Sequence, residues 1–300
     1  MNTPSLFAIQ TSLSVAMGLT VGRSALRKFG FLLLLATALG LPLVADPAPL
    51  ERTALTLIAL VALIKGTIIA TSKPDWQTPG RRIWQILTPF DARLTQRIAP
   101  GADLATLARM LIAAAVAALT MWYALEFLDL PRRFLLWAQL ACALVFAYSL
   151  MEFTAALIRA LHRLAGIDVP PLQRDPVLSC SVSEFWGERW NLPITRWLNE
   201  FFFRPLTRAG HPMSGIALAF VVSTALHAWL FFAAIGWKGA LSSSLFFLVQ
   251  IPALVIERRL LARQWPTIAR RAWTLGFLLL TSPLFVWPLV RGLEMQLASR

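Results

Sequence analysis

The sequence is short of the charged residues that soluble proteins place on their surfaces. Only 14% of its 300 residues are charged, whereas 57% are hydrophobic. A soluble fold does not need so much apolar sequence, but several membrane-spanning helices do, at roughly 20 residues each. The apolar runs are continuous and lack the short alternating strands of a membrane β-barrel. The composition therefore predicts an all-α, polytopic integral membrane protein.

Cysteine and histidine are also scarce. The two cysteines, Cys142 and Cys180, form neither a disulfide framework nor a metal-ligand pattern, so no metal site is expected. Two of the three histidines, His162 and His211, lie in polar stretches and are interpreted as ordinary interface residues. His227 differs because it lies near the middle of a strongly apolar run.

The apolar runs predict a bundle of about eight transmembrane helices, within a range of seven to nine, in a single domain spanning 1–300. No internal repeat or low-complexity tract divides the chain. The predicted spans are 5–21, 29–45, 53–71, 104–126, 134–153, 213–236, 240–256 and 272–290.

Acidic residues are few, and the net charge is +13. The placement of the basic residues favours membrane orientation over nucleic-acid binding. Alternating the spans puts the four most basic loops on one side, which the positive-inside rule makes cytoplasmic. Those loops are 22–28, 72–103, 154–212 and 257–271.

Two further features of the basic residues lead to predictions. Arginine makes up 24 of the 28 basic residues, which indicates a GC-rich genome and favours a bacterial inner membrane. Lys65 and Arg109 fall inside predicted spans, near their cytoplasmic ends. We expect both side chains to extend toward the lipid headgroups.

The cytoplasmic loop 154–212 is unusually long for a connection between packed helices. Stretch 183–204 has Trp186, Trp190 and Trp197 at helical spacing. The pattern predicts one long amphipathic helix that lies at the membrane interface or packs under the bundle.

His227 is a candidate catalytic residue. An ionisable side chain at that depth costs energy unless it faces the bundle interior or a cavity. Burial favours a neutral imidazole, which can accept a proton. A structural alternative is a hydrogen bond to a hydroxyl such as that of Ser223 or Thr224. No chain of ionisable groups accompanies His227, so general-base catalysis suits it better than proton relay.

The stretch SVSEFWGERWN, residues 181–191, also has two interpretations. It can be the start of an interfacial helix, with Ser183 as the N-cap and Glu184 near the positive end of the helix dipole. That interpretation does not explain why Arg189 and Asn191 lie beside an apolar face.

The same stretch resembles a known family. SEFWGERWN at 183–191 is similar to the motif of the wax-synthase-like branch of the membrane-bound O-acyltransferase (MBOAT) family, in which a transmembrane histidine follows 35 to 40 residues later. Asn191 matches the last residue of the family's motif, and His227, 36 residues later, matches its transmembrane histidine. Segment 196–208, with its Arg204–Pro205 pair, resembles the family's intervening sequence. The chain departs from the family at Ala228, where glutamate is common, and at Glu188, where arginine is common.

The resemblance implies transfer of an acyl group from a coenzyme A thioester to a lipophilic alcohol. His227 would act as the general base and Asn191 as a hydrogen-bond donor, within a catalytic core of about 154–260. Acyl-CoA would be a co-substrate, with no metal or other cofactor. The residues implied to line the substrate site are Arg189, Trp186, Trp190, Arg204 and Ser223.

Two other functions remain open at this point. The spans, arginines and prolines would also suit a transporter or flippase of an anionic lipid or metabolite. A relative that has lost catalysis could instead bind lipid or scaffold a complex. The sequence does not define the acceptor alcohol, the acyl chain length, the choice between coenzyme A and a carrier protein, or the oligomeric state.

Overall fold

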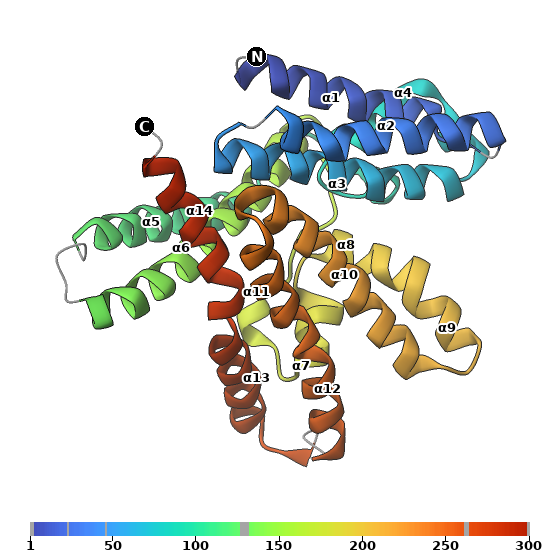
Figure 1. Ribbon diagram of the computed structural model, residues 1–300. Coiled ribbons are helices and arrows are strands. Elements are labelled where there is room, and N and C mark those ends of the chain that lie inside the picture. The colour runs from blue at the N-terminus through green and yellow to red at the C-terminus, as the bar shows by residue number, and fades with distance from the viewer. Residues whose placement is uncertain (1–2, 23, 46, 127–131, 261–263, 299–300) are drawn as a thin grey trace. The chain divides into compact units, whose positions relative to one another are not determined.

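The computed structural model describes residues 3–22, 24–45, 47–126, 132–260 and 264–298. Almost all of this part of the chain is helical (Figure 1). The strands found within it are the two-residue β1 (Gln96–Arg97) and β2 (Ile167–Asp168). The predicted all-α membrane fold class is therefore confirmed.

Six helical stretches among the described residues are long and apolar enough to cross a membrane. A seventh exists if α13 (Thr267–Thr281) and α14 (Pro283–Ala298), bent by 41°, form one broken span. The predicted count of eight is not confirmed, because α1 (Thr3–Thr20) carries too many hydroxyl and amide side chains to qualify. The six are Ala25–Val44, Pro49–Thr71, Leu104–Tyr123, Leu140–Leu164, Pro212–Ile235 and Trp237–Arg259.

The chain divides into two compact units. The first unit comprises 1–93, 197–247 and 291–300, and the second comprises 94–196 and 248–290. Each is described below by itself. That 1–300 acts as one membrane-embedded acyltransferase domain stays a prediction.

Three helices form the core of the first unit. α1 packs against both α2 (Ala25–Val44) and α3 (Pro49–Thr71), and α2 also packs against α3 (Figure 1). Their shared core contains Met17 and three small residues, Ala38, Ala59 and Ala62. Small side chains let helix backbones approach closely. Helix α10 (Pro212–Ile235) also packs against α3.

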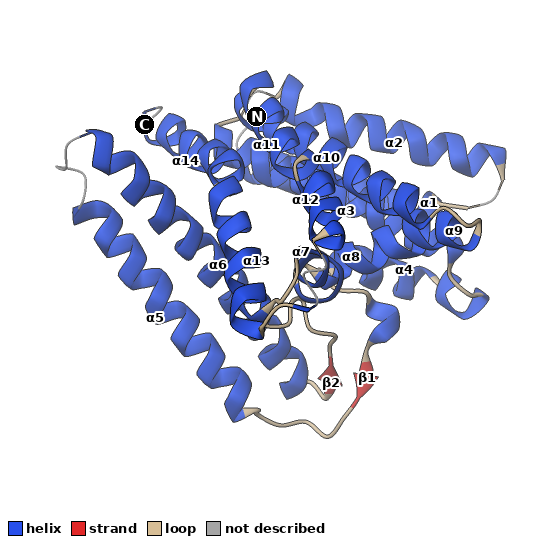
Figure 2. Cartoon of the chain, turned by 90° about the horizontal axis from the view of Figure 1, so that it is seen from below, coloured by secondary structure: helices blue, strands red, loops and turns tan. Residues whose placement is uncertain are grey.

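The second unit contains a long antiparallel hairpin of α5 (Leu104–Glu126) and α6 (Arg132–Leu164), which lie side by side (Figure 2). At one end of the hairpin, β1 pairs antiparallel with β2, with Gln96 opposite Asp168. Arg159 and Arg163 of α6 both donate to Oδ1 of Asp168, at 3.3 and 3.1 Å. These bonds tie the β2 turn to the end of α6.

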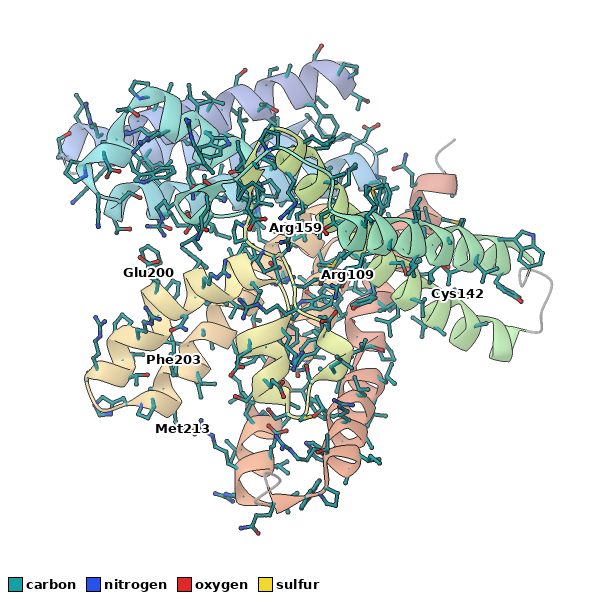
Figure 3. All side chains as sticks on the ribbon, turned by 180° about the vertical axis from the view of Figure 1, so that it is seen from behind. Arg109, Cys142, Arg159, Glu200, Phe203 and Met213 are labelled. Atoms are coloured by element: carbon teal, nitrogen blue, oxygen red, sulfur yellow. The ribbon has the colours of Figure 1, made fainter. Side chains whose placement is uncertain are left out.

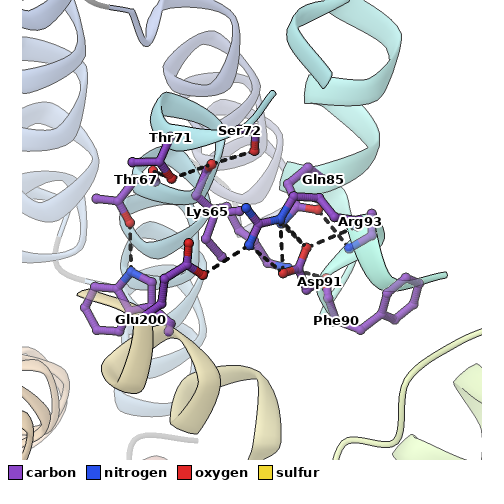
Figure 4. Close-up of polar contacts among 12 residues, drawn as sticks. Lys65, Thr67, Thr71, Ser72, Gln85, Phe90, Asp91, Arg93 and Glu200 are labelled. Carbon is purple, nitrogen blue, oxygen red and sulfur yellow. Dashed lines mark hydrogen bonds and ion pairs between the residues drawn. The ribbon is translucent and has the colours of Figure 1, made fainter. Parts of the chain in front are cut away.

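The two basic residues predicted to extend toward headgroups behave differently. Lys65 is only 4% exposed, and its ammonium group donates to the carbonyl oxygen of Phe90 (Figure 4). The prediction was wrong for Lys65, because a polar loop of the same unit folds over it. Arg109, marked on α5 in Figure 3, instead forms a 2.9 Å ion pair with Asp175, with both side chains about half exposed.

The loop over Lys65 also contains a partly exposed ion pair. Asp91 and Arg93 form an ion pair at 2.8 Å, and Arg93 reaches Glu200 at 3.4 Å (Figure 4). Burial opposes ionisation of Asp91, but the hydrogen bonds and positive charge of Arg93 outweigh it and lower the pKa of Asp91. Gln85 also closes the loop by accepting from the backbone N–H of Ala92 at 2.8 Å.

The predicted continuous amphipathic helix over 183–204 was also wrong. The segment consists of short pieces: α7 (Val182–Glu184), the π-helical turn η5 (Phe185–Arg189), α8 (Leu192–Leu198), the π-helical turn η6 (Asn199–Phe203) and α9 (Arg204–Arg208). The break comes at Trp190–Asn191. Pro193 has no backbone N–H to give to the carbonyl of Arg189, which accepts from Arg174 instead.

Candidate active site

His227 lies on the regular helix α10, and its imidazole has a defined hydrogen bond. The Nδ1 nitrogen lies 2.8 Å from the backbone oxygen of Ser223, one turn earlier. A carbonyl oxygen only accepts, so Nδ1 carries the hydrogen and the lone pair of the neutral ring is at Nε2. The structural alternative, a bond to a hydroxyl of Ser223 or Thr224, stays a prediction beside this bond to the backbone carbonyl.

The ring of His227 is also packed against an aromatic neighbour. Its centroid lies 4.1 Å from that of Phe247, at an interplanar angle of 33°. Phe247, from α11 (Trp237–Leu248), is buried and meets Phe246 edge to face. Apolar surroundings of this kind favour the neutral imidazole that a general base requires.

The N-terminal part of α10 approaches the π-helical turn η6 very closely. A Cβ atom added to Gly215 would lie 2.9 Å from the backbone oxygen of Phe203. Only glycine fits at position 215 without a shift of the neighbouring backbone. Phe203 and Met213 are marked on this hairpin in Figure 3.

The end of α8 is fixed to α3, and the following turn η6 is fixed to Arg93. Trp197, only 5% exposed, donates from its indole Nε1 to Oγ1 of Thr67 at 2.8 Å. The ion pair between Arg93 and Glu200 holds the turn η6. Arg204, the first residue of α9, is exposed. His227, Ser223 and Arg204 all belong to the first unit.

Asn191 lies in the second unit with a backbone that few residues adopt. Its φ is 42°, in the left-handed region, which asparagine tolerates better than most other non-glycine residues. Leu192 donates its N–H to the carbonyl of Leu172 at 2.8 Å, and Arg174 donates to that of Arg189 at 2.9 Å. These bonds hold the chain on both sides of Asn191. Left-handed residues and π-helical turns both recur at functional sites.

Arg189, predicted to contact substrate, has a clear structural contact. Its Nε donates to Glu184 at 2.6 Å, and Nη1 donates to the carbonyl oxygens of Arg174 and Asp175. Glu184 also accepts from the N–H of Cys180 at 2.8 Å. Burial raises the pKa of Glu184, but that backbone bond and the Arg189 charge more than compensate, so the pKa lies below its usual value.

The N-cap of α7 is Ser181, whose hydroxyl accepts from the N–H of Glu184 at 2.9 Å. The prediction of Ser183 as the cap was wrong by two residues, because the helix begins earlier. Ser181 and Glu184 are spaced as in a capping box, with Glu184 reaching back toward the preceding backbone.

Three residues far along the chain hold this segment, and the sequence patterns did not identify them. Glu257 of α12 (Gln250–Arg259) is 8% exposed and accepts from the N–H of Val182 at 2.9 Å. Arg270 of α13 donates to the carbonyl of Cys180 at 3.2 Å. Gln250, fully buried, accepts from Nε1 of Trp186 at 3.0 Å. A glutamine inside an apolar run was the available sequence signal.

The aromatic residues of the motif stack on one another. Trp190 lies parallel to Phe185, with ring centroids 5.4 Å apart, and parallel to Tyr148 of α6 at 6.3 Å. Thr195 donates its hydroxyl to the carbonyls of Trp186 and Trp190. The second unit therefore brings together Trp186, Arg189, Trp190 and Asn191 in one tightly bonded segment. Their roles toward a substrate stay predictions.

Metal-binding groups are not part of this site as far as the structure describes it. Within the described ranges, no three histidine, cysteine, aspartate or glutamate side chains gather in a way that could hold a metal ion.

This region is similar to known proteins. Residues 169–249, which include both Asn191 and His227, match the model of the membrane bound O-acyl transferase family. The chain is similar to the probable long-chain-alcohol O-fatty-acyltransferase 3 of Arabidopsis thaliana, with 30% identity over 167 residues. That match covers 50% of this chain and 48% of the relative.

Two further relatives match shorter parts. The long-chain-alcohol O-fatty-acyltransferase of Simmondsia chinensis is 30% identical over 90 residues, which are 27% of this chain and 26% of the relative. The acyl-CoA–sterol O-acyltransferase 1 of Arabidopsis thaliana is 32% identical over 92 residues, 28% of this chain and 27% of the relative. The chain thus spans about half, or less, of the length of these relatives. Over residues 169–249 the chain therefore resembles the membrane bound O-acyl transferase family, and the relatives that it matches are long-chain-alcohol and sterol O-acyltransferases.

Proposed function

We propose that this membrane protein transfers an acyl group from acyl-CoA to the hydroxyl of a lipophilic alcohol. The observation that carries the proposal is the hydrogen bond from Nδ1 of His227 to the carbonyl of Ser223, at 2.8 Å, inside the matched family segment. That bond directs the lone pair of the neutral ring to Nε2, where a general base needs it. The names of the related acyltransferases support the same reaction.

The proposed reaction is a direct transfer. Nε2 of His227 takes the proton of the alcohol as its oxygen attacks the carbonyl carbon of the thioester. The carbon–sulfur bond then breaks, and the imidazolium returns the proton to the leaving thiolate. Ester and free coenzyme A are the products. General-base help of this kind contributes about 10²- to 10⁴-fold in rate.

Asn191 would donate a hydrogen bond from its side-chain amide to the thioester oxygen as negative charge develops there. A donor is most effective when it is fixed before the reaction, and the backbone around Asn191 is fixed by bonds on both sides. Such a donor contributes about 10²- to 10³-fold. Trp186, Trp190 and Ser223 would line the substrate site, and the exposed Arg204 would attract the phosphates of coenzyme A. Arg189 would act mainly by holding the segment.

The proposed location is the cell membrane of a bacterium. Integral membrane insertion follows from the helices, but the bacterial assignment rests on the arginine bias alone, because the relatives named above are plant proteins.

The test is ester synthesis by membranes of a host that lacks the activity, supplied with labelled acyl-CoA and a panel of alcohols. We expect His227→Ala to reduce ester formation by about 10²- to 10⁴-fold. His162→Ala is a matched control, because His162 makes the same bond from Nδ1 to the carbonyl four residues earlier, also at 2.8 Å. Ester formation that survives in His227→Ala would refute the assigned base.

The same preparation separates the enzyme from a transporter or flippase. The enzyme releases coenzyme A only when an alcohol acceptor is present. A transporter would move an anionic lipid or metabolite across sealed vesicles without acyl-CoA and would release none. Flux without ester formation would overturn the proposal.

A further inference from the structure

One buried side chain of the second unit has polar atoms that the fold does not satisfy. Gln173 is only 7% exposed, and neither its Oε1 nor its Nε2 has a hydrogen-bond partner among the described residues. Buried polar atoms are almost always bonded. Leaving one without a partner makes folding less favourable, and Gln173 leaves two. An amide in this position can be satisfied by a ligand.

The backbone places Gln173 across from Asn191. Leu172 accepts from Leu192, and Arg174 donates to Arg189, so the two bonds bracket Gln173 in one chain segment and Trp190–Asn191 in the other. Between these two bonds, Gln173 in the first segment therefore lies opposite Trp190 and Asn191 in the second. Gln173 is thus a direct neighbour of the left-handed residue assigned to the donor thioester.

We propose that Gln173 binds an amide group of the pantetheine arm of acyl-CoA. This inference rests on the proposed function and specifies how the donor is held. A glutamine side chain offers one hydrogen-bond acceptor and one donor group, and each amide of the pantetheine arm offers the complementary pair. The nearer of those amides is separated from the thioester sulfur by two methylene groups. A side chain opposite Asn191 is therefore suitably placed for the amide when Asn191 holds the thioester oxygen.

The donor fits these features better than the acceptor alcohol does. A lipophilic alcohol dissolved in the membrane carries a single hydroxyl, which the mechanism assigns to His227. Gln173 belongs to the loop 154–212, which the charge distribution assigns to the cytoplasmic side, from which water-soluble coenzyme A arrives.

The test compares wild type with Gln173→Leu, which has similar size but no polar atoms. With acyl-CoA, we expect the KM for the donor to rise by about 10-fold, the effect of one or two lost hydrogen bonds, while the KM for the alcohol stays unchanged. With an acyl thioester of a simple alkanethiol, which has no amide, wild type and variant should perform equally. A penalty that persists with the amide-free donor, or a change confined to the alcohol KM, would overturn the inference.

Two controls separate binding from folding. Gln173→Leu removes unsatisfied buried atoms, so its thermal midpoint in detergent should equal or exceed that of wild type. A lower midpoint would show that Gln173 supports the fold instead. Val177→Ala, in the same loop and 51% exposed, should leave both KM values unchanged.

A binding measurement distinguishes failure of this inference from failure of the proposed function. Calorimetry with free coenzyme A on the purified protein needs no acceptor and no chemistry. Binding that weakens about 10-fold in Gln173→Leu supports the site even if no ester is formed. Intact ester synthesis with equal coenzyme A affinity in both proteins would reject the role of Gln173 and leave the acyltransferase proposal standing.

Discussion

His227 and Asn191 are held in contrasting ways. His227 lies on a regular 24-residue helix, and the hydrogen bond that orients it comes from the same helix, one turn away. Asn191 lies in a broken segment whose shape depends on side chains as far as 90 residues along the chain. A regular helix presents a side chain by its own geometry. An irregular segment must be held by its surroundings, so it can be disrupted from more places.

The largest expected effect tests whether the side chain or the backbone of Asn191 matters. Asn191→Gly keeps the left-handed backbone and removes the amide, so ester synthesis should fall by about 10²- to 10³-fold while the thermal midpoint stays close to wild type. Asn191→Val should lose activity and also about 1–2 kcal/mol of stability, since a branched residue disfavours that backbone.

Asp175→Gly is the matched control, because Asp175 has the same φ of 42° in the same segment. Its activity should stay within a few-fold of wild type. If Asn191→Gly retained full ester synthesis, the side chain of Asn191 would have no part in the reaction.

The next effect tests the remote supports of the irregular segment. Glu257→Ala removes the buried acceptor of the Val182 N–H, and we expect it to lower the free energy of unfolding by about 1–3 kcal/mol. Glu257→Gln keeps one acceptor oxygen, so its free energy of unfolding should lie between those of wild type and Glu257→Ala. Hydrogen exchange at the amide of Val182 should be faster in the variant that loses more stability.

Glu188→Ala provides the control, because Glu188 is an exposed glutamate of the same motif. Its unfolding should match wild type within about 0.5 kcal/mol. Equal losses from both variants would mean that the acceptor at Glu257 has no special role.

A smaller effect tests a contact between α8 and α3, within the unit that also contains the regular helix. Thr67→Val keeps the shape of the side chain but removes the acceptor of the Trp197 indole N–H, with an expected cost of about 1 kcal/mol. Thr67→Ser should restore the bond. Thr71→Val, one turn later, removes a hydroxyl that is bonded only within its own helix. It should therefore lower the free energy of unfolding by less than Thr67→Val does. A larger loss in Thr71→Val would contradict the assigned tie.

The smallest expected effect is on how stability depends on pH. One carboxyl group from each unit, Glu184 and Asp91, allows the two units to be compared. Glu184 and Asp91 both have a pKa below the ordinary values of 4.5 and 3.8. Each carboxylate therefore stabilises the fold above its ordinary pKa, and this contribution is lost as the pH falls through the lower folded value.

We expect Glu184→Gln and Asp91→Asn each to reduce stability near neutral pH by no more than about 1 kcal/mol, because both ion pairs are partly exposed. The difference in the free energy of unfolding between each variant and wild type should disappear below the pKa of the carboxyl group in the folded protein. Unfolding curves across the acid range measure this difference. A difference that grows on acidification would contradict the lowered pKa of the carboxyl group.

Sequence patterns predicted the parts of this protein that depend on periodicity. Long apolar runs identified most of the helices able to span a membrane, because hydropathy alone determines that property. The position of His227 was equally readable, since an imidazole in an apolar run is conspicuous. The resemblance of the motif at 183–191 to a known family came from a combination of residues and not from any single one, and the family model matches the surrounding segment 169–249.

The remaining features depend on contacts between distant residues. The burial of Lys65 requires the carbonyl of Phe90, 25 residues later, and no local pattern indicates that the loop folds back. The break at Asn191 has two causes: Pro193, and the hydrogen bond from Arg174 to the carbonyl of Arg189. The sequence reveals the proline but not the hydrogen bond. Gln173 looked like an ordinary loop residue, because burial and missing partners are properties of the folded chain.

The support of residues 180–183 by Glu257 and Arg270 has a consequence for biosynthesis. These partners are separated in the chain by 75 and 90 residues. At ordinary translation rates, the ribosome needs on the order of ten seconds to make the intervening polypeptide. During that interval the motif around Asn191 has emerged without the helices that hold it. Its final shape must therefore form after α12 and α13 have been synthesised, as a late step in membrane assembly.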